Sequence, residues 1–155
     1  MKTGLSILVA LAIATGAQAQ DFYAGGALDY AYPHSGDSQL VGSVIGGLAL
    51  SNNPDLNYGA EAELGWHLAG DADYGTQRLR LWSTYDLGDV RARVAGGLTY
   101  YDIPGGDANG TNLGVGVERD FSPNVTLRGE FIRDFMDDTF TAAVTTTRIA
   151  VLYNF

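Results

Sequence analysis

The chain has 155 residues, a net charge of −9 at pH 7 and no cysteine. This length suits one domain, and the lack of cysteine excludes a disulfide-stapled miniature fold and thiolate metal sites. An acidic chain is a poor match for a phosphate backbone, which excludes nucleic acid as a partner.

The first 19 residues have the three parts of a secretory signal. Lys2 supplies a positive start, residues 5–14 form an apolar run, and Ala17-Gln18-Ala19 offers the small residues that a signal peptidase accepts. The apolar run is shorter than the roughly 20 residues of a membrane-spanning helix. We therefore expect cleavage after Ala19 and a mature domain over residues 20–155.

The remaining chain alternates between apolar and polar residues in eight segments. A period of two is typical of strands, and most of these segments reach about ten residues, the length that a tilted strand needs to cross a bilayer. Their approximate ranges are Phe22–Tyr32, Leu40–Leu50, Leu56–Leu68, Arg78–Leu87, Val90–Ile103, Thr111–Phe121, Val125–Phe135 and Ala143–Phe155. The pattern predicts an all-β fold, an eight-stranded antiparallel up-and-down transmembrane β-barrel.

Alternation also fits a soluble barrel with its apolar face inward. Other features of the sequence must therefore decide whether the apolar face points inward or outward. The connections near residues 51–55, 88–89 and 122–124 are short, whereas those near 33–39, 69–77, 104–110 and 136–142 are longer and rich in Asp and Gly. Aromatic residues gather near the strand ends. Both features are typical of a membrane barrel with its apolar face toward lipid.

The polar face carries both signs of charge at mid-strand depth. In a narrow lumen such charges must pair, so we expect an ionic plug with Glu61 or Glu63 against Arg80 or Arg93, and Glu130 against Arg128 or Arg148. Arg78, Asp29, Asp86, Asp120 and Asp134 could contribute. The predicted lumen network consists of Glu61, Glu63, Arg80, Arg91, Arg93, Glu118, Arg128, Glu130 and Arg148.

The last strand ends in the alternating sequence Val151-Leu152-Tyr153-Asn154-Phe155. With the signal peptide and the preceding segments, this ending resembles the small outer-membrane β-barrel superfamily, the OmpA/OmpX-type porin family of Gram-negative cells. The resemblance implies a cell outer membrane location, an assembly signal at Tyr153 and Phe155, and the barrel-assembly machinery, membrane lipids and lipopolysaccharide as partners. We expect a monomer without the peptidoglycan-binding domain of full-length OmpA-type proteins.

The fold does not choose among functions, and three remain open. The first is a non-enzymatic barrel with a largely plugged lumen that supports envelope integrity or surface interaction. The second is a small gated pore for ions or small solutes. The third is a lipid A-modifying enzyme, for which His34-Ser35 with Asp71 or Asp73 and the second histidine, His67, are the available groups. We expect no enzyme activity, no cofactor and no metal.

Overall fold

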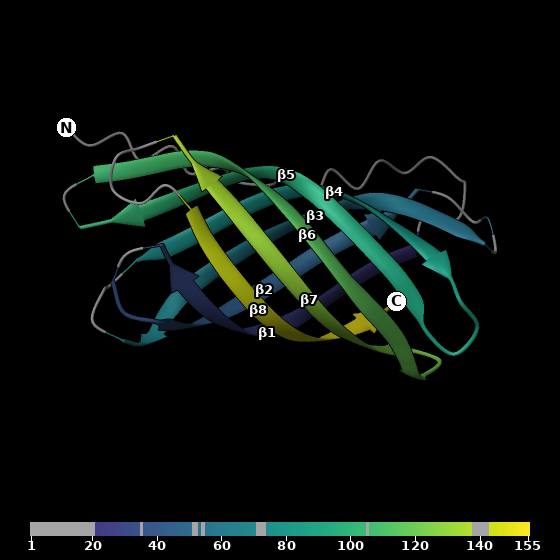
Figure 1. Cartoon of the computed structure of the whole chain (residues 1–155). Coiled ribbons are helices and arrows are strands. Elements are labelled where there is room, and N and C mark those ends of the chain that lie inside the picture. Colours follow the sequence, from purple (N-terminus) through teal and green to yellow (C-terminus); the bar gives the residue numbers. More distant parts are fainter. Residues whose placement is uncertain are drawn as a thin grey trace.

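The computed structural model describes residues 21–34, 36–50, 53, 55–70, 74–104, 106–137 and 143–155. The predicted signal peptide, residues 1–19, lies outside them. The described residues form eight strands in one closed antiparallel barrel, in which each strand pairs with the next and the last pairs with the first (Figure 1). The strands are β1 (Asp21–Pro33), β2 (Gln39–Ala49), β3 (Leu56–Ala69), β4 (Gly75–Asp86), β5 (Arg91–Ile103), β6 (Gly106–Ser122), β7 (Val125–Met136) and β8 (Ala143–Asn154). This confirms the predicted fold class.

No helix in the described part of the chain is long and apolar enough to cross a membrane.

The period of two in the sequence separates an inner face from an outer face. Glu63 in β3 is 2% exposed inside the barrel, while its neighbour Leu64 is 52% exposed on the outside. The same contrast holds along the other strands, so large apolar side chains cover the exterior. Since this is the reverse of a soluble barrel, the predicted outward direction of the apolar face is confirmed.

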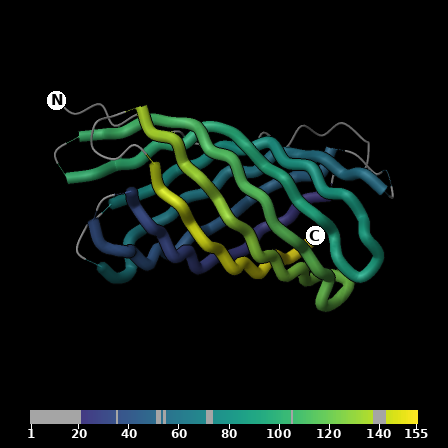
Figure 2. The backbone as a smooth tube through the Cα atoms, viewed as in Figure 1, coloured from purple at the N-terminus to yellow at the C-terminus, as the bar shows by residue number. Residues whose placement is uncertain are grey.

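The strands are tilted against the barrel axis, and the C-terminus lies at the same end as the turns that join β4 to β5 and β6 to β7 (Figures 1 and 2). We call this the terminal end and the other the distal end. Exposed aromatic side chains form a band near each end: Tyr30, Tyr32, Trp66 and Phe135 at the distal end, and Tyr58, Tyr85, Phe121, Tyr153 and Phe155 at the terminal end. Such bands suit the boundary between lipid and water.

Two strands begin earlier than the sequence predicted. β4 starts at Gly75 instead of Arg78, and β6 starts at Gly106 instead of Thr111. The predicted long loop over residues 104–110 is therefore wrong, because Tyr101 pairs with Ala108 and Ile103 pairs with Gly106. The composition Gly-Asp-Ala-Asn-Gly resembles a turn, but Ala108 is buried inside the barrel beside Tyr101 and continues the inward face.

Two apolar clusters lie inside the barrel, one toward each end. The distal cluster contains Ala31, Tyr101, Ala108, Met136 and Val144. The terminal cluster contains Tyr23, Ala27, Ile45, Trp82, Ala95, Ala150 and Leu152. Between and among them lie the buried charged side chains of the lumen, as expected for an eight-stranded barrel, whose interior is just wide enough for side chains.

Candidate functional site: the charged lumen

The lumen holds a dense set of buried charges. Among the described residues, five arginines and six carboxylates are almost inaccessible: Arg78, Arg80, Arg93, Arg128 and Arg148, with Asp29, Glu61, Glu63, Glu118, Glu130 and Asp134. Each of these arginines forms at least one ion pair with a carboxylate of the set. Burying an unpaired charge is costly, so this near balance of signs is what allows so many charges to lie inside the barrel.

Arg80 in β4 lies at the centre of the network and is 0% exposed. Its Nη2 lies 2.6 Å from Oε1 of Glu130 in β7, and its Nη1 lies 3.1 Å from Oε1 of Glu63 in β3. Nε donates a hydrogen bond of 2.9 Å to Oδ1 of Asn112. The guanidinium therefore joins opposite walls of the barrel, and its planar fork suits several carboxylates at once.

Glu61 organises the part of the network toward the terminal end. Its Oε1 lies 2.6 Å from Nη2 of Arg93, and its Oε2 lies 2.9 Å from Nη1 of Arg128. The hydroxyl of Tyr23 donates to the same Oε2 at 2.7 Å. Arg128 also reaches Oε1 of Glu118 at 2.8 Å. Contacts from β1, β5 and β7 thus converge on one carboxylate of β3.

Arg148 and Asp134 organise the part toward the distal end. Arg148 donates to both oxygens of Asp29 at 2.7 Å and to Oε1 of Glu63 at 2.6 Å. Asp134 accepts a hydrogen bond of 2.8 Å from Nη2 of Arg78. The hydroxyls of Thr99 and Tyr101 also donate to Asp134, each at 2.8 Å. These side chains adjoin the distal apolar cluster, since Tyr101 belongs to both.

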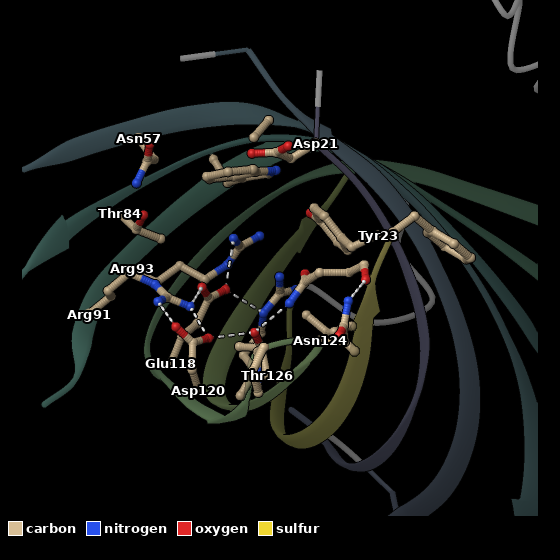
Figure 3. A pocket seen from close by; sticks show the side chains of 17 residues that line it. Asp21, Tyr23, Asn57, Thr84, Arg91, Arg93, Glu118, Asp120, Asn124 and Thr126 are labelled. Atoms are coloured by element: carbon tan, nitrogen blue, oxygen red, sulfur yellow. Dashed lines mark hydrogen bonds and ion pairs between the residues drawn. The ribbon is translucent and has the colours of Figure 1, made fainter. Parts of the chain in front are cut away.

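At the terminal end the lumen opens into a cavity of about 390 Å³. Arg91, Arg93, Glu118 and Asp120 lie together on one side of this cavity, across from Tyr23 (Figure 3). Arg91 holds Asp120 with two hydrogen bonds of 2.5 and 2.8 Å, and both side chains are partly exposed. Arg93, Glu118 and Arg128 of the buried network line this cavity.

The structure brings together most of the predicted lumen residues but not always with the predicted partners. Glu61 and Glu63 do contact Arg80, and Glu61 contacts Arg93. The predicted pairing of Glu130 with Arg128 or Arg148 is wrong, since Glu130 pairs with Arg80 across the lumen. An arginine side chain is long enough to span this narrow interior. Arg80 of β4 can therefore pair with a carboxylate on the opposite strand β7 as well as with those on adjacent strands.

The membership of the lumen network differs from the prediction in two ways. Asp86 is exposed at the β4–β5 turn, where it accepts a hydrogen bond from the backbone of Gly88, and it does not join the lumen. The hydroxyls of Tyr23, Ser43, Thr99 and Tyr101 and the amide of Asn112 were not predicted as members of the network. These residues lie on the polar side of the alternating strand patterns, and this position in the sequence could have indicated that they face the lumen.

The groups considered for catalysis do not form a site among the described residues. Ser35, Asp71 and Asp73 lie outside them. The ring of His67 stacks on Tyr74 at 6.2 Å between centroids, and Tyr74 in turn packs on Tyr101 inside the lumen. Among the described residues no group of three or more His, Asp or Glu side chains has a geometry that could hold a metal ion.

No model of a known protein family and no curated protein sequence matches the chain, but several solved structures do. Neisserial surface protein A (NspA) is 15% identical with a TM-score of 0.59, over 88% of this chain and 97% of that one. The N-terminal β-barrel domain of OprF from Pseudomonas aeruginosa is 12% identical with a TM-score of 0.63, over 87% and 97%. Ail, the attachment invasion locus protein of Yersinia pestis, is 14% identical with a TM-score of 0.55, over 88% and 97%.

The chain has the fold of the small outer-membrane β-barrels. At these identities the likeness concerns the fold alone. The expected resemblance is confirmed at that level, and the apolar exterior with its two aromatic bands supports the expected outer-membrane location.

Proposed function

We propose that the protein is a non-enzymatic outer-membrane barrel whose lumen is plugged by its own side chains, and that it serves envelope integrity or surface interaction. The observation that carries the proposal is Arg80, fully buried and held by Glu61, Glu63 and Glu130 from opposite walls. In this arrangement the terminal end faces the periplasm, because in this fold the short turns lie on that side.

The energetics of the network support a permanent plug. Opening a path would separate buried ion pairs, and breaking one such pair by removing a partner costs about 3–5 kcal/mol. Arg80 alone contacts three carboxylates, and Arg148 and Arg78 seal the next layer. Lipids, lipopolysaccharide and the assembly machinery are the proposed partners of the monomeric barrel, whose lumen offers little room for a solute.

Recordings in planar lipid bilayers test the plug directly. The purified barrel should insert without steady conductance, because the layers around Arg80 and Arg148 leave no continuous aqueous path. A large and steady conductance of the wild-type protein would contradict the proposal.

The same recordings on Arg80→Ala separate a plug from a gate. A plug built of several layers should stay closed in this variant, since Arg78, Arg93, Arg128 and Arg148 still fill the lumen. Arg119→Ala, an exposed arginine on the outer face, is the matched control. Strong channel activity in Arg80→Ala but not in Arg119→Ala would identify a gated pore instead.

A further inference from the structure

Two arginines lie on the outer face of the barrel, in contrast to those of the lumen. Arg119 in β6 and Arg133 in β7 are exposed and alternate with apolar residues that face outward. Neither forms an ion pair with a carboxylate among the described residues, whereas the five buried lumen arginines and Arg91 at the cavity do. A guanidinium on a lipid-facing surface is costly unless it reaches an anion or water.

Arg133 belongs to a small polar patch on an otherwise apolar surface. Its guanidinium donates a hydrogen bond to the hydroxyl of Thr145 in β8. The strand register places Tyr32 of β1 beside Thr145, and Tyr30 beside Thr147, so these side chains share one side of three adjacent strands. The rings of Tyr30 and Tyr32 contact each other edge to face at 4.6 Å between centroids. We call Tyr30, Tyr32, Arg133, Thr145 and Thr147 the Arg133 patch.

The patch lies at the depth of lipid headgroups on the distal side. Arg133 is three residues before the end of β7 at Met136, and Thr145 is the third residue of β8. Three residues of strand span about 10 Å, less along the membrane normal because the strand is tilted. Both tyrosines belong to the distal aromatic band, which marks the boundary between lipid and water.

The chemistry of the patch fits a phosphorylated sugar. Arginine recognises phosphate with two parallel hydrogen bonds, and the threonine and tyrosine hydroxyls can donate to and accept from sugar hydroxyls. Aromatic rings next to these groups offer apolar faces for a sugar ring. A plain phospholipid would use the guanidinium but leave most of the hydroxyls unused.

We propose that the Arg133 patch binds the phosphorylated sugar headgroup of a lipopolysaccharide molecule in the outer leaflet. This inference rests on the proposed outer-membrane location, which puts the distal end at the outer leaflet. Arg133 holds the phosphate, Thr145 orients the guanidinium, and Tyr30, Tyr32 and Thr147 contact the sugar. The barrel thereby gains a fixed lipid neighbour on the β7–β8–β1 side.

Native mass spectrometry of the detergent-purified full barrel can test the site, with phosphorylated lipid A as the probe. The wild-type barrel should retain lipid A, and Arg133→Gln should bind it about tenfold more weakly, the effect of losing one charge-assisted interaction. Arg119→Gln removes the other exposed exterior arginine, near the terminal end, and should bind lipid A as wild type does. Lipid A without phosphates should lose the difference between wild type and Arg133→Gln.

Three results would overturn the site: equal binding by wild type and Arg133→Gln, equal loss in Arg119→Gln, or equal retention of phosphatidylglycerol and lipid A. The last result would indicate general attraction of anionic lipids. The failure of this site is distinguishable from failure of the plug, because Arg133 lies outside the lumen and bilayer conductance does not depend on it.

Discussion

Glycines inside the barrel make room for the large side chains that cross it. A Cβ atom on Gly114 would overlap Nη2 of Arg80 and Oε1 of Glu130, the pair at the centre of the network. A Cβ atom on Gly59 would overlap the ring of Trp82. Small residues on the polar side of a strand are therefore part of the charged site, because the ion pairs need the space that the glycines leave.

Gly114→Val should destabilise the barrel by about 1–3 kcal/mol, the usual cost of overpacking a filled interior, and should displace the Arg80–Glu130 pair. Unfolding by urea in lipid vesicles, followed by tryptophan fluorescence, measures the change. Gly129→Val is the matched control, since Gly129 lies on the next strand with no atom near its Cβ position. If the two variants lost equal stability, crowding of the ion pair would not be the cause.

At the scale of a single element, β8 closes the barrel by pairing with β7 on one side and β1 on the other. After its last residue, the backbone N–H of Phe155 donates to the carbonyl of Phe22 at 2.9 Å, and the ring of Phe155 packs against Tyr153 at 5.2 Å. The side chain of Phe155 is 75% exposed, so it contributes little to interior packing. Its role as an assembly signal stays a prediction.

Phe155→Ala should reduce the amount of folded barrel in the outer membrane of cells, while the purified chain should still refold in lipid. The reason is that an exposed terminal ring matters for recognition more than for packing. Phe121→Ala removes another exposed aromatic of the terminal band, 78% exposed, and should assemble normally. Equal reductions in both variants would indicate a general need for interfacial aromatics instead of a terminal signal.

The elements show where sequence patterns are informative and where they are not. Alternation in β3 predicted both faces correctly, because the period of a strand is fixed by its backbone. The start of β6 at Gly106 was missed, since the same Gly, Asp and Asn residues form turns elsewhere and only pairing with β5 selects the strand. The Glu130–Arg80 pair was missed for a similar reason, because contacts across a lumen depend on how far the barrel closes.

For the whole molecule, the network stabilises the barrel through ion pairs between strands that are not neighbours, such as β4 with β7 and β3 with β7. Arg80→Ala removes the close ion-pair partner of Glu130 and one of the partners of Glu61 and Glu63, so we expect a loss of about 3–5 kcal/mol in the free energy of unfolding. Arg91→Ala removes an ion pair at the open cavity and should cost only about 0–1 kcal/mol. The temperature at which the folded form changes its mobility in SDS gels should fall in the first variant and stay near wild type in the second. A similar fall in both variants would contradict the central place of Arg80.

The positions of the ion pairs also set an order of events for folding. Arg148 of β8 reaches Glu63 of β3, and Arg128 of β7 reaches Glu61 of β3, so both pairs join the first half of the chain to the second. Both pairs span the lumen, so the side chains reach each other only when the sheet curls toward a closed barrel. In an open sheet Arg128 can already pair with Glu118 of the adjacent β6. Arg148 meets Asp29 of β1 and Glu63 of β3 only when the barrel closes. A partly closed barrel would hold Arg148 without its carboxylate partners, which raises its free energy relative to the closed barrel.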